Sequence, residues 1–256
     1  MSVYTTEITS DQIPSDNPIH QRLLSAYHFA QEYIKGDLLE LGCGEGRGVE
    51  LLVPRADSYL GIDKIDSIVQ DLKHRFPSYK FMQGTFPPFP FKDNQFDCLV
   101  TFQVIEHVEE DLEFIKEIHR VLKPGGKALM TTPNIKMTLS RNPWHIREYT
   151  AAELTQLCEK VFSKVEMMGV AGNEKVLAYH KQNRASVNKI MKYDIFNLQH
   201  RLPASLLRKP YEVLNRINRK KLKNAEDSLA LEIGWNDFKL VAQHEQNLDL
   251  FCFLTK

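Results

Sequence analysis

Apolar and polar positions alternate along the first two thirds of the chain in a way that predicts strands and helices in turn. Five short apolar runs have the length of buried strands, at 38–41, 58–62, 79–83, 96–102 and 127–132. Segments with apolar residues at helical spacing lie before or between these runs, at 18–34, 48–53, 67–76 and 112–122. Such alternation requires right-handed crossovers, and therefore a parallel sheet that helices cover on both faces.

The regular alternation of predicted strands and helices ends after the fifth strand. Thr150 and Glu153 have the spacing of a capping box that starts a helix, and 163–168 reads as a sixth strand. Helical signals then continue from 174 to about 234, and 248–254 alternates like a final strand. We interpret the helical stretch as an insertion between the last two strands of one sheet. A separate C-terminal domain, with the seventh strand at 176–179, is the alternative.

These patterns predict an α/β protein with a Rossmann-like, seven-stranded, mostly parallel sheet and helices on both faces. The predicted parts are an N-terminal helical cover at 1–35, a Rossmann-like core at 36–173, a basic helical insertion at 174–234, and one or more final strands at 235–256 that return to the sheet.

Composition limits the function classes. The 256 residues include 33 basic and 33 acidic side chains, so the net charge argues neither for nor against a nucleic-acid partner, and we expect none. The N-terminus is polar and unlike a signal peptide, and no apolar run approaches the roughly 20 residues that span a bilayer. We expect a soluble, cytoplasmic protein. No metal-ligand spacing is visible, and the cysteines form no CxxC pair, which favours reduced thiols at Cys43, Cys98, Cys158 and Cys252.

The sharpest chemical signal is a glycine-rich turn between the first strand and the next helix. Gly42 and Gly44 would let a ligand approach the backbone closely. A dinucleotide fingerprint would need glycine or alanine where Arg47 stands. Glu40 in the strand suits a ligand that carries an amino group, and Asp63 at the end of the next strand can accept both hydroxyls of a ribose. A glycine turn without a ligand is the alternative.

Four motifs follow one another in order, and together they resemble the class I S-adenosylmethionine-dependent methyltransferases. They are ELGCGEGRG from Glu40, GID ending at Asp63, FDCLVTFQVIEH at 96–107, and RVLKPGG at 120–126. The resemblance covers roughly 26–170. It implies a methyltransferase enzyme of Rossmann-like fold, with S-adenosyl-L-methionine as its cofactor.

The resemblance also implies which residues surround that cofactor. The residues around its methionine part would be those just before and within the glycine turn, with Gln103 near the methionine and the methyl group. Asp63 would bind the ribose hydroxyls, and Lys64 and Ile65 would lie beside the adenine. Many relatives have an acidic residue for the adenine amino group where this chain has Thr85, so that contact differs here. The implied cofactor residues are Glu40, Gly42, Cys43, Gly44, Asp63, Lys64, Ile65, Thr85 and Gln103.

Two histidines are candidates for catalysis. His107 follows the fourth strand, where the family's acceptor pocket opens, and His145 lies in an NPxHxxEY-like stretch at 142–149 that is similar to sequences in sugar and cell-envelope methyltransferases. A base is needed only when the acceptor atom carries a proton, and histidine titrates near neutrality. The alternative is that both histidines only hold their loops in place.

The insertion is basic. Residues 181–223 contain twelve lysines and arginines and two acidic residues, a net charge of +10. We expect a small-molecule acceptor, and the basic segment favours an anionic one, such as a phosphorylated or nucleotide-linked sugar held by Arg216, Arg219 and Lys220. A peripheral contact with an anionic membrane and a merely solvated face are the alternatives. The predicted reaction is O-methylation of a small molecule or a sugar or glycan precursor. A nucleic-acid or protein methyltransferase, and a non-catalytic cofactor-binding protein, are alternatives.

Overall fold

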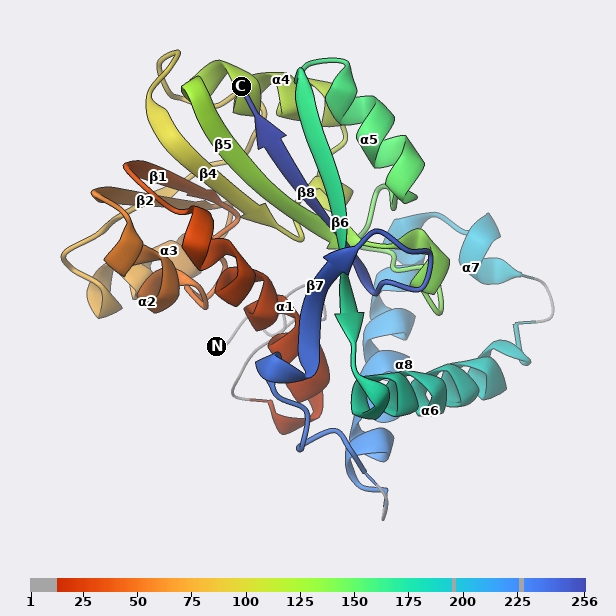
Figure 1. The fold of residues 1–256 in the computed structure, drawn as a ribbon. Coiled ribbons are helices and arrows are strands. Elements are labelled where there is room, and N and C mark those ends of the chain that lie inside the picture. The colour runs from red at the N-terminus through yellow and green to blue at the C-terminus, as the bar shows by residue number, and fades with distance from the viewer. Residues whose placement is uncertain (1–12, 195–196, 226–227) are drawn as a thin grey trace.

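In the part of the chain that the structure describes, one eight-stranded sheet organises the fold, in the order β3-β2-β1-β4-β5-β8-β6-β7 (Figure 1). The computed structural model describes residues 13–194, 197–225 and 228–256. The strands are β1 (Asp37–Leu41), β2 (Ser58–Asp63), β3 (Lys80–Gln83), β4 (Phe96–Phe102), β5 (Leu122–Pro133), β6 (Lys164–Gly172), β7 (Phe238–Ala242) and β8 (Asp249–Thr255). Strands β1 to β5 pair in parallel, whereas β8 is antiparallel to both of its neighbours, β5 and β6.

The prediction of an α/β, mostly parallel sheet is confirmed, but the prediction of seven strands is wrong by one. Strand β6 runs to Gly172, beyond the predicted end at Met168. The extra length presents an edge on which β7 pairs antiparallel, from Met168↔Ala242 to Gly172↔Phe238. With only five residues, β7 is too short for its hydrophobic pattern to distinguish it from the loops around it.

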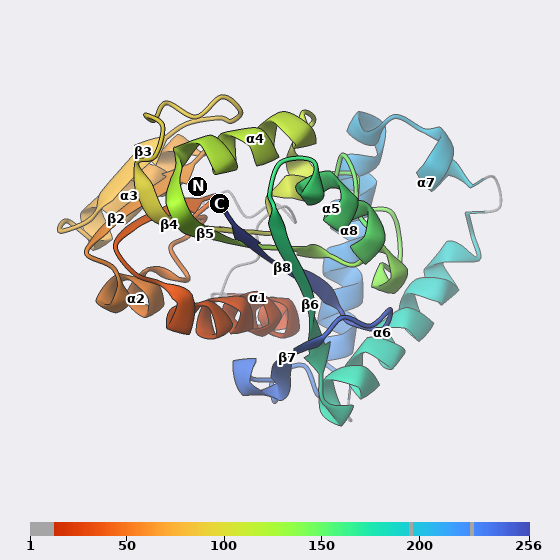
Figure 2. The same cartoon turned by 45° about the horizontal axis from the view of Figure 1, so that its top comes forward.

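Helices cover both faces of the sheet, as expected (Figure 2). Helices α1, α2 and α3 pack on one face through residues such as Tyr27, Leu52 and Leu72. Helices α4 and α5 pack on the other face through Phe114 and Leu154. The helices of the core are α1 (Asn17–Ala30), α2 (Val49–Leu52), α3 (Asp66–Arg75), α4 (Asp111–Val121) and α5 (Ala151–Glu159). The capping box of α5 is confirmed, since Thr150 and Glu153 bond each other's backbone N–H.

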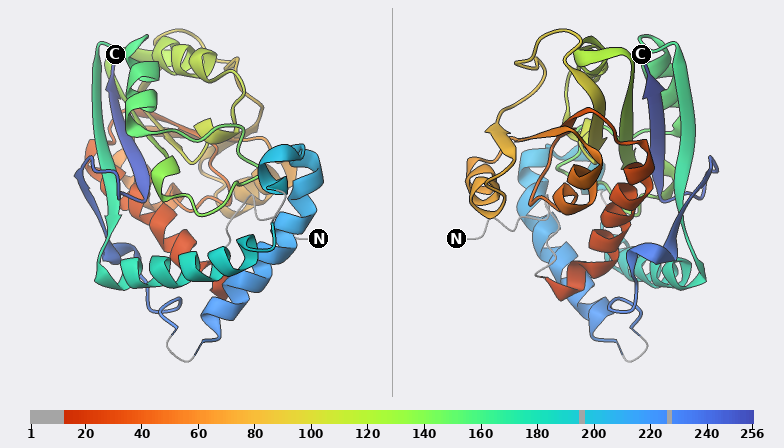
Figure 3. Two further views of the ribbon diagram at one scale, coloured as in Figure 1. Left: turned by 90° about the vertical axis from the view of Figure 1, so that its right-hand side faces the viewer. Right: turned by 60° about the vertical axis from the view of Figure 1, so that its left-hand side comes forward.

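Three further helices follow β6, namely α6 (Glu174–Met191), α7 (Leu198–Arg201) and α8 (Ala204–Lys223). The segment 176–179 therefore lies in α6 and is not a strand. Helices α6 and α8 contact each other beyond the end of the sheet at which β6 ends (Figure 3). That end carries the carboxyl termini of the parallel strands, which is where open α/β sheets bind ligands. Within the described ranges, no helix is long and apolar enough to cross a membrane.

Candidate functional site

A cavity of about 570 Å³ lies between the carboxyl ends of the parallel strands and the helical insertion. Its wall combines the glycine turn after β1, the loops after β2, β3 and β4, a loop at 133–148, and faces of α6 and α8. Every predicted site residue except Glu40 lines it: Gly42, Cys43, Gly44, Asp63, Lys64, Ile65, Thr85, Gln103, His107 and His145. The structure thus brings both predicted groups, cofactor residues and histidines, into one space.

The glycine turn leaves room for a ligand. The N–H groups of Gly42 and Cys43 both donate to the carbonyl of Ile62, at 2.8 and 3.0 Å, which ties the turn to β2. Gly42 has φ +74°, and a Cβ there would lie 2.4 Å from Val104. Gly44 has φ +50°, and among the residues that the structure describes, its two chain neighbours aside, no heavy atom lies within 4 Å of the place where its Cβ would be. The space beside Gly44 is therefore open for a bound molecule to approach the backbone.

Asp63 is held rigidly at the cavity wall. Its Oδ2 accepts the N–H of Gly44 and its Oδ1 accepts the N–H of Ile65, both at 2.9 Å, and the residue is only 8% exposed. An ionised carboxylate has about four lone-pair sites, so each oxygen can accept one more hydrogen bond. The arrangement fits a pair of ribose hydroxyls, and with the open glycine turn it fits the nucleoside part of S-adenosylmethionine.

Glu40 lies beneath the turn and not on the cavity wall. Its carboxylate is buried and accepts hydrogen bonds from the hydroxyls of Tyr27, at 2.7 Å, and Tyr59, at 2.6 Å. Burial raises the pKa of Glu40 to about 7, although the two hydroxyls act in the opposite direction. Sequence reasoning missed both tyrosines, because one comes from α1 and the other from β2. Direct contact between Glu40 and an amino group stays a prediction.

Gln103 turns the chain at the end of β4. It has φ +59°, an uncommon value for a residue other than glycine. Its backbone N–H donates to the Thr131 carbonyl at 2.9 Å, and its side-chain amide donates to the Thr131 hydroxyl at 3.3 Å. These contacts fix the loop that begins after β4 and continues to His107. The strained backbone therefore sits where the predicted cofactor side of the cavity meets the histidines.

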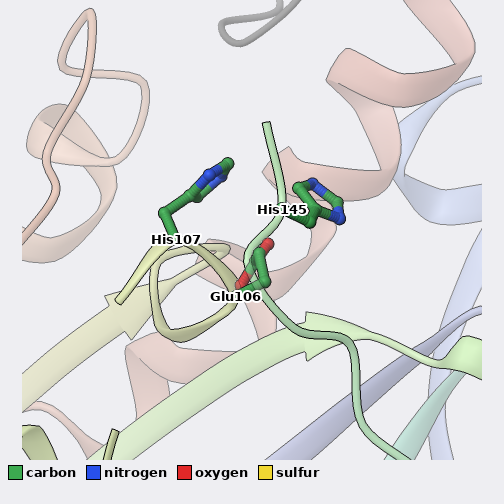
Figure 4. A group of neighbouring side chains, drawn as sticks. All are labelled: Glu106, His107 and His145. Carbon is green, nitrogen blue, oxygen red and sulfur yellow. The ribbon is translucent and has the colours of Figure 1, made fainter. Parts of the chain in front are cut away.

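The two histidines, distant in sequence, meet edge to face with ring centroids 5.0 Å apart (Figure 4). His107 Nδ1 donates to the carbonyl of Trp144 at 2.9 Å. His145 Nδ1 donates to Oε1 of Glu148 at 2.6 Å, and its Nε2 accepts from the side-chain amide of Asn142 at 2.8 Å. Both rings are thus oriented by neighbours from the 142–148 loop.

Glu106 is a functional candidate that sequence reasoning did not select. It is 1% exposed and lines the cavity between the two histidines. Its Oε2 accepts from the Thr132 hydroxyl at 2.9 Å, and burial raises the pKa of its carboxyl to about 7. Its backbone carbonyl accepts the N–H of Ile146 at 2.7 Å, which joins the two histidine loops. Spacing along the sequence gave no sign of this cluster, since His145 comes from another loop.

The insertion contributes a polar wall, but part of its charge is neutralised. Arg216 and Arg219 pair with Asp16 at 2.8 and 3.0 Å, and the Asp16 side chain is fully buried. Arg219 lines the cavity as a member of this pair, together with Asn218 from the same helix. Two of the three cations expected to face an anionic acceptor are therefore already paired. Sequence patterns could not show this, because Asp16 precedes α1.

Comparisons with known proteins agree with this geometry. Residues 39–130 match the model of a methyltransferase domain family. A probable S-adenosylmethionine-dependent methyltransferase of Mycolicibacterium smegmatis is 40% identical over 136 residues, which are 51% of this chain and 52% of the relative. A fatty-acid O-methyltransferase of the same species is 29% identical over 126 residues, 46% of either chain.

The fold extends further than the sequence similarity. A solved structure from Thermotoga maritima, described as an S-adenosylmethionine-dependent methyltransferase and possible histamine N-methyltransferase, superposes with a TM-score of 0.58. That match covers 93% of this chain and 91% of the other at 15% identity, and so establishes the fold alone. The chain spans about half the length of the curated relatives it matches.

Proposed function

We propose that the whole chain transfers a methyl group from S-adenosylmethionine to an oxygen of a small acceptor, because residues 39–130 match a methyltransferase domain family and a similar protein is a probable S-adenosylmethionine-dependent methyltransferase. One observation carries the proposal. A single cavity holds the open glycine turn and Asp63 on one side, and His107 and His145 on the other. A cofactor and an acceptor can therefore lie side by side in it.

The cofactor would be held by the turn at Gly42 and Gly44, by Asp63, and by Lys64, Ile65 and Thr85 around the adenine. When bound, S-adenosylmethionine supplies a methyl group on a positively charged sulfur. Glu40 supports the turn from below through Tyr27 and Tyr59, so its contribution to binding is mainly to keep the turn in place.

The protein's own contribution is placement and proton handling. Holding two reactants in a productive geometry can supply about 7–11 kcal/mol of the barrier. Residues of helices α6 and α8 line the side of the cavity where the acceptor would lie. His107 and His145 face the acceptor side, where a hydroxyl that gives up its proton would lie.

The acceptor we propose is a hydroxylated small molecule with a lipid part. The name of the fatty-acid O-methyltransferase relative supports oxygen as the acceptor atom. A sugar or glycan precursor remains compatible when it is attached to a lipid. The pairing of Arg216 and Arg219 with Asp16 weakens the case for a freely diffusing phosphorylated sugar.

The outer face of α8 supports a lipid acceptor that is taken from a membrane surface. Leu206, Val213 and Ile217 lie on one side of the helix and are 62%, 58% and 57% exposed. Lys209 and Lys220 flank this apolar ridge and are exposed too. An apolar ridge edged by lysines suits the surface of an anionic bilayer, while the opposite face of the same helix lines the cavity.

Calorimetry and a transfer assay test the proposal. Calorimetry should show binding of S-adenosylmethionine and S-adenosylhomocysteine but not of NAD. Radiolabelled methyl transfer should then be screened against hydroxylated lipids, lipid-linked sugars and nucleotide sugars. Transfer to nucleotide sugars alone would contradict the lipid part of the proposal. Failure of either cofactor form to bind at millimolar concentration would contradict the function itself.

A further inference from the structure

Three side chains with metal-ligating atoms converge in the cavity without being needed to hold the cofactor. Glu106, His107 and His145 each offer one ligand atom, and these atoms all lie within 4.8 Å of one another. Glu106 and His107 come from the turn after β4, and His145 comes from the loop before α5. Two imidazoles and one carboxylate form a donor set that zinc and other first-row divalent cations use.

The histidines are prepared for this role by their hydrogen bonds. A metal-bound histidine commonly donates its second N–H to a carboxylate or a backbone carbonyl, which fixes the tautomer. His107 donates Nδ1–H to the Trp144 carbonyl, and His145 donates Nδ1–H to Glu148. Both rings therefore carry the lone pair on Nε2. The His145–Glu148 contact is the carboxylate–histidine pair that often stands behind a metal ligand.

Glu106 provides a second, independent sign of a missing partner. Its Oε1 is fully buried and has no hydrogen-bond partner among the residues that the structure describes. A buried carboxylate without a cation or a full set of donors is costly. The same residue's Oε2 is fixed by Thr132, so Oε1 is the atom left for a ligand.

We propose that Glu106, His107 and His145 bind one divalent cation of the zinc type in the acceptor half of the cavity. Three protein ligands leave at least one coordination position open, which is the arrangement of catalytic metal sites. Asn142, whose amide now donates to His145 Nε2 at 2.8 Å, moves aside when the cation binds.

The role of the cation rests on the proposed function. An acceptor hydroxyl that occupies the open position is polarised by the cation and has a lowered pKa. Its O–H bond then breaks with the electron pair left on oxygen, and the proton passes to solvent water. In this arrangement His107 and His145 act through the cation, and neither has to accept the proton.

Metal binding should be tested directly on tag-free protein stripped with a chelator. Titration with zinc chloride in a calorimeter should show one equivalent bound, and cobalt(II) should give visible d–d bands typical of imidazole ligation. His107→Ala, His145→Ala and Glu106→Gln should each abolish the binding. Glu148→Gln should weaken it by about 10- to 100-fold, as is usual for a residue behind a metal ligand.

His74→Ala is the matched control, since His74 is an exposed histidine on α3 outside the cavity, and it should bind zinc as the wild type does. Circular dichroism establishes that each variant is folded, and the cobalt spectrum of the wild type provides a readout that needs no variant. Absence of zinc and cobalt binding to the wild type, or binding unchanged in all three ligand variants, overturns the proposal.

Binding of S-adenosylhomocysteine to the same samples separates the two proposals. If it binds to protein that takes up no metal, the metal site fails and the proposed function stands. If it does not bind at all, the proposed function fails regardless of the metal.

Discussion

The two sides of the cavity are built differently. On the cofactor side, the groups that matter are close in sequence or on adjacent strands, as with Asp63, Gly44 and Ile65. On the acceptor side, contacts join segments that are far apart, such as Asp16 with Arg219, and Glu106 with the backbone of Ile146. The cofactor side is therefore formed by one local sequence motif, and the acceptor side by loops and inserted helices that are distant in sequence.

This difference teaches where specificity can change. The cofactor side depends on one turn and one carboxylate, so it tolerates little variation without losing its ligand. The acceptor side depends on long-range pairs, and new acceptors can be accommodated by altering α6, α8 or the 133–148 loop while the turn stays intact. Substitutions on each side separate the two experimentally.

The largest effect is expected on turnover from the acceptor side. His107→Ala and His145→Ala should each lower turnover by about 10²- to 10⁴-fold, the range for losing help in removing the acceptor proton, whether the ring gives that help directly or through a bound cation. Cofactor affinity should stay nearly unchanged, because neither ring touches the glycine turn or Asp63. Steady-state kinetics and calorimetry check this. Wild-type turnover in both variants would remove the histidines from the mechanism.

Asp16→Ala should cost about 3–5 kcal/mol of unfolding free energy, the usual effect of leaving buried charges unpaired. Arg219 would lose its partner inside the protein, and α8 would lose its attachment to the start of α1. Urea denaturation measures the loss. Asp71→Ala is the matched control, because its ion pair with Arg75 is exposed and should contribute less than about 1 kcal/mol. Equal costs for both variants would contradict the assignment of Asp16.

On the cofactor side, Asp63→Asn should weaken binding of S-adenosylhomocysteine about tenfold to a hundredfold, since hydrogen bonds to a charged group contribute about 1.5–3 kcal/mol. The change keeps the size of the side chain, but its amide nitrogen cannot accept one of the two backbone N–H groups, so thermal denaturation should establish that the variant is folded. Asp66→Asn, an exposed residue at the start of α3, is the control and should bind normally. Undiminished binding by the Asp63 variant would refute its role.

Glu40 should make stability depend on pH. Burial raises its folded pKa from 4.5 to about 7, so the folded protein keeps a proton that the unfolded chain releases between those values. Its contribution to stability is therefore complete below about pH 4.5 and is lost as pH rises through 7, with a slope of at most about 1.4 kcal/mol per pH unit. The wild type should lose stability relative to Glu40→Gln across this window. Denaturation at several pH values should reveal it, and parallel curves would disprove it.

The smallest effect is expected at the outer face of α8. Replacing Lys209 and Lys220 by alanine should weaken binding to vesicles with anionic lipid by about 1 kcal/mol per lysine. Co-sedimentation with vesicles of phosphatidylglycerol and phosphatidylcholine measures it, with pure phosphatidylcholine as the neutral comparison. Lys73 on α3 and Lys80 at the start of β3 are both exposed, and their double alanine variant serves as the control. If both pairs behave alike, α8 has no special affinity for lipid.

Sequence patterns predicted the parallel half of the sheet, and all but one of the residues they selected for the cofactor line one cavity, because glycine turns and strand-end carboxylates are local signals. They did not reveal Tyr27 and Tyr59 on Glu40, since that contact requires the register of β1 with β2 and the position of α1. They also missed the grouping of Glu106 with both histidines, and the pairing of Asp16 with Arg216. Each depends on residues brought together only when the sheet and the insertion have formed. The strand β7 was missed because its pairing depends on the length of β6.

The position of β8 has a consequence for how the protein is made. It follows every other strand in chain order, yet it lies between β5 and β6. During synthesis on the ribosome, strands β1 to β5 and the antiparallel pair of β6 and β7 therefore emerge as two separate sheet fragments with open edges. They can join only after β8 leaves the exit tunnel and inserts between them. Until that moment the nascent chain is a candidate for chaperone binding, because unpaired strand edges invite aggregation.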